Sequence, residues 1–165
     1  MRKICLPLTK QIISDLKPGE EVLLTGSILT ARDAAHKRLI DALKSGKELP
    51  VSIKGETIYY TGPTPTRPGE VIGSCGPTTS SRMDDFTLIL LKHGLLGMIG
   101  KGERSVEVKK AIKKAGAVYF VTIGGAGAYL SEKVKESEII AYKDLRTESI
   151  RKLVIEDFPA IVSIG

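Results

Sequence analysis

Hydroxyl and cationic side chains gather in residues 76–84, Gly-Pro-Thr-Thr-Ser-Ser-Arg-Met-Asp. The opening Gly-Pro pair ends the preceding structure, and the apolar run at 86–91 predicts a buried helix. Thr or Ser is a favoured N-cap, and Asp84 and Asp85 suit a first helical turn. The free N–H groups of that turn and an adjacent guanidinium favour a bound carboxylate or phosphate. An ordinary hydroxyl-rich helix cap is the alternative. The candidate binding residues are Thr78, Thr79, Ser80, Ser81 and Arg82.

A second stretch of this kind lies upstream, at residues 30–39, Thr-Ala-Arg-Asp-Ala-Ala-His-Lys-Arg-Leu. Thr30 is the expected N-cap of a helix. Arg32 then falls in the first turn, where a cation opposes the helix dipole and is not placed for helix stability. His36 follows four residues later on the same helical face. Together Arg32 and His36 indicate an anion subsite. The alternatives are an exposed arginine and a histidine on the polar face.

A third candidate is Lys101, between the two glycines of a Gly-Lys-Gly turn. A phosphate-binding Walker loop is excluded, because Leu95 and Gly102 stand where that pattern needs Gly and Ser or Thr. We expect a short strand over 95–99 that ends at this turn, where flanking glycines let the backbone approach a ligand. Lys101 then acts as a point charge. An ordinary surface lysine is the alternative.

The elements that position these residues alternate between strands and helices, so the predicted class is α/β, in one domain over residues 1–165. The strand at 21–29 contains Gly26, which marks a bulge or a close approach of two backbones. Ligands collect at strand C-terminal ends in open α/β sheets, so the three stretches are expected to converge there. The other expected elements are strands at 57–60, 117–123, 138–142, 153–156 and 161–164, a helix at 103–115 and a tight glycine turn at 124–128.

Composition limits the class of protein. The chain has 165 residues, of which 42% are hydrophobic and 27% charged, so a packed aliphatic core is expected. No window reaches a membrane-spanning length without charge, and no signal peptide is evident, so cytoplasmic is the default location. The only cysteines, Cys5 and Cys75, are too few for a disulfide framework or a cysteine-only metal site. No metal ligands are predicted.

The net charge of +6 fits either nucleic acid or small anions and an acidic partner surface. The chain lacks an RNA-binding aromatic motif, zinc-finger spacing and a basic arm, so nucleic acid is disfavoured. The lysines at 109–114 instead follow the spacing of a solvated helix face.

Three motifs in order, at residues 25–37, 76–84 and 100–102, resemble the C-terminal domain of class I iron–sulfur fumarate hydratases. Residues 124–128 resemble that family too. In two-subunit members this domain is a separate β subunit, as in L(+)-tartrate dehydratase. The resemblance implies a swivelling β/β/α-type domain and a 4Fe-4S cluster carried by an α subunit, in a probable α2β2 assembly. It also implies reversible hydration of fumarate to L-malate, a reaction of the tricarboxylic acid cycle.

By the same resemblance, Arg32, Arg82 and Lys101 hold the carboxylates of a small dicarboxylate substrate, with the hydroxyls of Thr79, Ser80 and Ser81 beside them. Thr78 matches the proposed catalytic base. A free threonine hydroxyl is a weak base, so that role requires local activation. His36 is a second candidate catalytic residue.

Three functions follow from the sequence. The chain is the β subunit of a hydro-lyase acting on fumarate or on tartrate, a stand-alone module that binds anions or nucleotides, or a basic nucleic-acid binder. Of these three functions, only the hydro-lyase β subunit requires a partner for turnover. The nucleic-acid binder predicts binding that weakens steeply with salt.

Overall fold

A mixed sheet that closes on itself forms the centre of the molecule. The computed structural model describes residues 1–122 and 126–165. The strands are β1 (Arg2–Cys5), β2 (Glu21–Thr30), β3 (Thr57–Tyr59), β4 (Gly97–Gly100), β5 (Val118–Val121), β6 (Val134–Ala141) and β7 (Ile150–Ile164). Strands β2, β3, β4 and β5 run parallel in this spatial order. Strand β7 pairs antiparallel with both β5 and β2, and so closes a ring of five strands.

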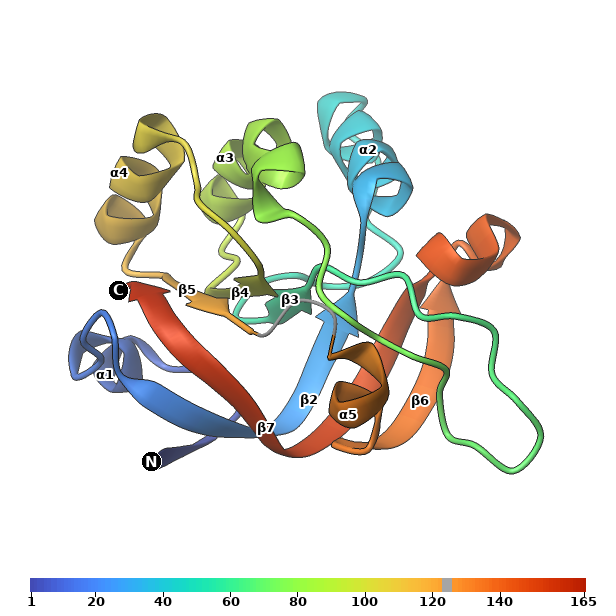
Figure 1. Cartoon of the computed structure of the whole chain (residues 1–165). Helices are drawn as coiled ribbons and strands as arrows, with labels where there is room; N and C mark the ends of the chain where they lie inside the picture. Colours follow the sequence, from blue (N-terminus) through green and yellow to red (C-terminus); the bar gives the residue numbers. More distant parts are fainter. Residues whose placement is uncertain (123–125) are drawn as a thin grey trace.

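The helices cover mainly one side of this sheet. They are α1 (Lys10–Ser14), α2 (Asp33–Lys44), α3 (Asp84–Lys92), α4 (Val106–Ala115) and α5 (Gly127–Ser131), with 3-10 turns η1 (Ser80–Met83) and η2 (Lys143–Glu148). In Figure 1, α2, α3 and α4 stand side by side above the short parallel strands, while α1 and α5 lie apart from this layer. No helix of the described residues is long and apolar enough to cross a bilayer.

The period of two along the short strands produces two hydrophobic cores. Tyr59, Ile99 and Phe120 point into the closed sheet and pack with the inward side chains of β2 and β7. Their chain neighbours Ile58 and Met98 point the other way, into a second core beneath α2, α3 and α4. Because both faces of these strands are covered, they read as continuous apolar runs in the sequence.

Gly26 behaves as its sequence context predicts. The β2–β7 register shifts between Leu24 and Gly26, so the strand is bulged at this point. Gly26 has φ +136°, and a Cβ there would lie 2.8 Å from Leu6 Cβ. A side chain is therefore excluded by both backbone conformation and space.

The predicted α/β class is confirmed, but several boundaries are wrong. Thr30 is the last residue of β2 and not a helix N-cap; its hydroxyl accepts a hydrogen bond from Arg151 N at 3.0 Å, and Arg32 is the N-cap. The sheet is closed and not open. The two strands expected at 153–156 and 161–164 form one continuous strand, β7. The glycine turn expected at 124–128 falls partly outside the described residues.

Candidate active site

The C-terminal ends of three adjacent parallel strands bring the predicted stretches together. Arg32 follows β2, Tyr60 follows β3 and Lys101 follows β4. The ladder continues past the strand ends, because Ala31 N donates to Tyr59 O at 3.1 Å and Tyr60 N donates to Ile99 O at 2.9 Å. These ends are therefore held in register, which is the edge where α/β proteins gather ligand-binding groups.

The hydroxyl-rich segment 78–80 inserts between the ends of β3 and β4. Thr78 N donates to Tyr60 O at 2.7 Å, on the β3 side. Thr79 forms a parallel bridge with Lys101, and Ser80 N donates to Lys101 O at 2.9 Å, on the β4 side. The predicted N-cap of α3 is wrong, since Met83 occupies that position; Thr79 is the N-cap of η1, and neither residue makes a side-chain capping hydrogen bond. Strand-like pairing, not helix capping, fixes these residues.

Both candidate arginines reach Asp33, the first residue of α2. Arg82 Nη2 lies 3.1 Å from Asp33 Oδ2, and Arg32 Nε lies 4.0 Å from Asp33 Oδ1. Arg82 has 51% of its side chain exposed and Arg32 has 27%, so both remain accessible. Among the described residues, Arg32 Nε and Asp33 Oδ1 are buried without a hydrogen-bond partner. The structure thus joins Arg32 and Arg82 through one carboxylate.

Gly62 gives the Arg32 side chain its room. A Cβ at this position would lie 2.9 Å from Arg32 Cδ and 3.1 Å from Arg32 Nη1. The same Cβ would lie 3.2 Å from Thr147 O, so the glycine is bounded on two sides. The guanidinium therefore lies against the backbone of the segment that follows β3.

A buried ionic network supports the site from below. The Arg104 side chain is fully buried, and its Nε donates to Asp84 Oδ1 at 2.7 Å. Its Nη2 donates to Thr87 Oγ1 at 2.8 Å and its Nη1 to Tyr60 OH at 3.2 Å. Asp84 Oδ2 also accepts from Ser105 N at 2.9 Å. This network ties the start of α3 to the segment that follows Lys101 and to the end of β3.

Tyr119 joins the hydroxyl segment to the lysine turn. Its hydroxyl donates to Ser80 Oγ at 2.6 Å and lies 2.8 Å from Gly102 O. Burial raises the pKa of Tyr119 to about 12, so the phenol stays protonated and remains a donor. Gly100 makes room for Ser80, because a Cβ there would lie 2.0 Å from Ser80 Oγ. Ser80 is fully buried, whereas Thr79 and Ser81 are exposed and Thr78 is half-buried.

His36 lies beneath the site and not on it. The residue is fully buried, and its ring stacks on Phe86 and meets Tyr60 edge-on. Nδ1 lies 2.8 Å from Arg32 O, which fixes the proton on Nδ1 because a carbonyl only accepts. Burial lowers the pKa of His36 to about 4, so the ring is neutral at physiological pH. The alternative of a histidine on the polar face is wrong, and the catalytic role stays a prediction that this burial does not support.

The cysteines do not fit an iron–sulfur cluster. Cys5 is exposed on β1, whereas Cys75 is fully buried beside Tyr59. Burial raises the pKa of Cys75 to about 12, and a cluster needs thiolates. The described residues contain no group of three or more His, Cys, Asp or Glu side chains placed to hold a metal ion. This part of the chain therefore offers no cluster-binding set.

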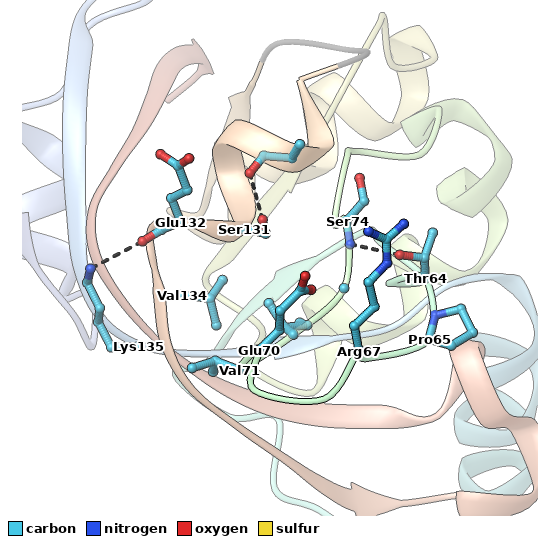
Figure 2. Close-up of a pocket in the computed structure, with 13 residues that line it drawn as sticks. Thr64, Pro65, Arg67, Glu70, Val71, Ser74, Ser131, Glu132, Val134 and Lys135 are labelled. Carbon is cyan, nitrogen blue, oxygen red and sulfur yellow. Dashed lines mark hydrogen bonds between the residues drawn. The ribbon is translucent and has the colours of Figure 1, made fainter.

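A large hollow lies away from Arg32, Arg82 and Lys101. A pocket of about 610 Å³ opens between the loop 64–74, α5 and the start of β6 (Figure 2). Arg67 and Lys135 on its wall are matched by Glu70 and Glu132, and all four residues are exposed. Balanced, solvated charges of this kind do not select an anion. We therefore place the candidate site at the strand ends and not in this pocket.

The domain is thus a closed α/β sheet that carries cations at the ends of its parallel strands. The chain belongs to the Fumarase C-terminus family, whose model matches residues 1–165. It is 41% identical over 160 residues to the anaerobic class I fumarate hydratase of Escherichia coli, covering 94% of this chain and 29% of that protein. Mitochondrial fumarate hydratase 1 of Leishmania major is 38% identical over 161 residues, covering 96% of this chain and 29% of that protein.

A relative of similar length also exists. The putative L(+)-tartrate dehydratase subunit beta of Methanocaldococcus jannaschii is 36% identical over 163 residues, covering 95% of this chain and 84% of that protein. By contrast, the chain spans less than a third of the two fumarate hydratases. The family resemblance derived from the three motifs is thereby confirmed.

Sequence reasoning missed three residues of the site and its support. No predicted motif assigns a role to Asp33, because its contact with Arg82 crosses from α2 to η1. Arg104 and Tyr119 lie in stretches interpreted as a basic helix and a buried strand. The position of Arg104 two residues after the Gly-Lys-Gly turn was one available signal.

Proposed function

We propose that this chain is the β subunit of a two-subunit iron–sulfur hydro-lyase that reversibly hydrates fumarate to L-malate. The observation that carries the proposal is that Arg32 and Lys101 follow the ends of β2 and β4 at one sheet edge, with Arg82 of η1 paired to Asp33 beside Arg32, in a member of the Fumarase C-terminus family. Class I fumarate hydratases are iron–sulfur enzymes, and the cluster would supply Lewis-acid chemistry from the partner α subunit. The match over 84% of a putative L(+)-tartrate dehydratase subunit beta supports a separate-subunit organisation.

In this proposal the chain supplies the cationic half of the pocket. Arg32 and Arg82 bind substrate carboxylates through their planar forks, and Lys101 adds a point charge. Placed where negative charge develops on a carboxylate during proton removal, these cations stabilise the transition state. Thr78 and the exposed hydroxyls of Thr79 and Ser81 lie at the same edge. Thr78 takes part in moving the proton, with an acid or base of the partner completing the pair.

We assign the buried members positioning roles. His36 holds the carbonyl of Arg32, and Ser80 is held by Tyr119, so each fixes a neighbour instead of contacting substrate. The substrate is either fumarate or, as the name of the Methanocaldococcus relative suggests, tartrate, which carries additional hydroxyl groups.

The test is anaerobic co-expression with a candidate α subunit, reconstitution with iron and sulfide, and assay with fumarate and with tartrate. Arg82→Gln and Lys101→Met should each lower kcat/KM by about 10²–10³-fold, the usual effect of removing one transition-state donor. Arg38→Gln is the matched control, because Arg38 pairs with Asp144 on the outer surface of α2. Turnover by Arg82→Gln at the level of the control would overturn the site. Anion binding without turnover in any complex would favour the stand-alone binding module.

A further inference from the structure

Asp33 is the acid that lies between the site's two arginines. Its Oδ2 lies 3.1 Å from Arg82 Nη2, and its Oδ1 lies 4.0 Å from Arg32 Nε. The Asp33 side chain is about one-third exposed, at 36%, although its Oδ1 atom is buried without a hydrogen-bond partner. Since Arg82 belongs to η1 and Arg32 precedes α2, Asp33 connects two separate elements. It acts on these cations from within the site.

The neighbouring acids are engaged elsewhere. Asp84 pairs with the buried Arg104, so the charges of these two side chains offset each other. Glu148 Oε1 accepts from Ala34 N at 3.2 Å and so offsets the positive end of α2. Among the described residues, Asp33 is the acid within salt-bridge distance of Arg32 or Arg82. The negative charge of Asp33 is therefore the one that offsets the positive charges of Arg32 and Arg82.

We propose that Asp33 is a specificity-determining residue that makes the site select dicarboxylates over tricarboxylates. Arg32, Arg82 and Lys101 with Asp33 carry a net charge of +2, which a dicarboxylate dianion balances. A third carboxylate on the same probe would be repelled by Asp33. The inference rests on the proposed function for the substrate class, and it names the residue that sets the charge limit.

The experiment measures binding of two unreactive probes, succinate and tricarballylate, to the full chain by NMR titration at low ionic strength. Asp33→Asn should shift the ratio of the two dissociation constants toward tricarballylate on the order of tenfold, because one nearby repulsive charge is removed. Asp33→Ser makes the same charge change with a residue suited to a helix start. Asp33→Glu should restore the wild-type ratio.

The matched control is Asp144→Asn, which removes a carboxylate from a surface pair with Arg38 and should leave the ratio unchanged. If Asp33 only held Arg82 in place, the neutral variants would weaken both probes equally and the ratio would stay constant, which overturns the proposal. Failure of the wild-type chain to bind either probe also overturns it. A shifted ratio combined with no hydration by any assembled complex would instead refute the proposed function alone.

Discussion

Replacing Arg104 by methionine tests whether the buried ionic network carries the site. The side chain is fully buried and gives hydrogen bonds to Asp84, Thr87 and Tyr60. Its guanidinium carbon also lies 5.2 Å from the Tyr60 ring centre and 4.8 Å from that of Tyr119. Methionine fills similar space but leaves the Asp84 carboxylate, with only 12% of its side chain exposed, without its cation.

We expect Arg104→Met to lower the free energy of unfolding by about 3–5 kcal/mol, the usual effect of removing one partner of a buried ion pair. Most of this loss comes from the stranded carboxylate of Asp84. The double variant Asp84→Asn, Arg104→Met should therefore lose less than the sum of the single variants, with a coupling of about 1–3 kcal/mol.

The assay is urea unfolding followed by far-ultraviolet circular dichroism. Lys109→Met is the matched control, because its partner Glu103 has 88% of its side chain exposed, and its unfolding midpoint should equal that of the wild type. A loss below about 1 kcal/mol for Arg104→Met, or additive single variants, would refute the reasoning.

Three further predictions concern other buried positions. Gly100→Ala places a Cβ 2.0 Å from Ser80 Oγ and should destabilise the fold by about 1–3 kcal/mol in thermal melting; an unchanged melt would contradict this crowding. Burial lowers the pKa of His36 from 6.5 to about 4, so the unfolded state binds more protons within this window. Stability should therefore fall by about 3 kcal/mol from pH 6.5 to 4, and His36→Gln should abolish this contribution; an identical slope in both would exclude it. A thiol reagent should label exposed Cys5 quickly and Cys75 only on unfolding, since burial raises the pKa of Cys75 to about 12; fast double labelling would disprove this.

The sequence predicts the local elements of the site well because their signals are local. The run at 86–91 lies within α3, and of the two glycines in 100–102, Gly100 ends β4 and Gly102 follows it. Gly26 is bulged, as its place within an apolar strand predicts. That Arg32 and Lys101 reach one sheet edge also follows from parallel pairing, whereas segment 78–80 reaches it through its own pairing with Tyr60 and Lys101.

The remaining features depend on contacts between distant residues, which no local pattern encodes. The closure of the sheet rests on β7 pairing with β2, where Glu21 faces Ile161. Thr30 has a side chain typical of an N-cap, but its hydroxyl instead accepts a hydrogen bond from the backbone N–H of Arg151 in β7. His36 has polar spacing on its helix, yet Phe86 and Tyr60 enclose it from other elements.

The closing strand has a consequence for the order in which the molecule assembles. Strand β7 is the last element described, and it supplies the antiparallel partner for both β2 and β5. Until β7 pairs with them, β2 and β5 each have an unpaired edge, and the side chains that point into the closed sheet remain uncovered. Because these pairings join residues far apart in the chain, their loop-closure entropy slows folding. During synthesis, the end of β2 that precedes Arg32 can therefore become rigid only after the fifteen-residue strand β7 has emerged.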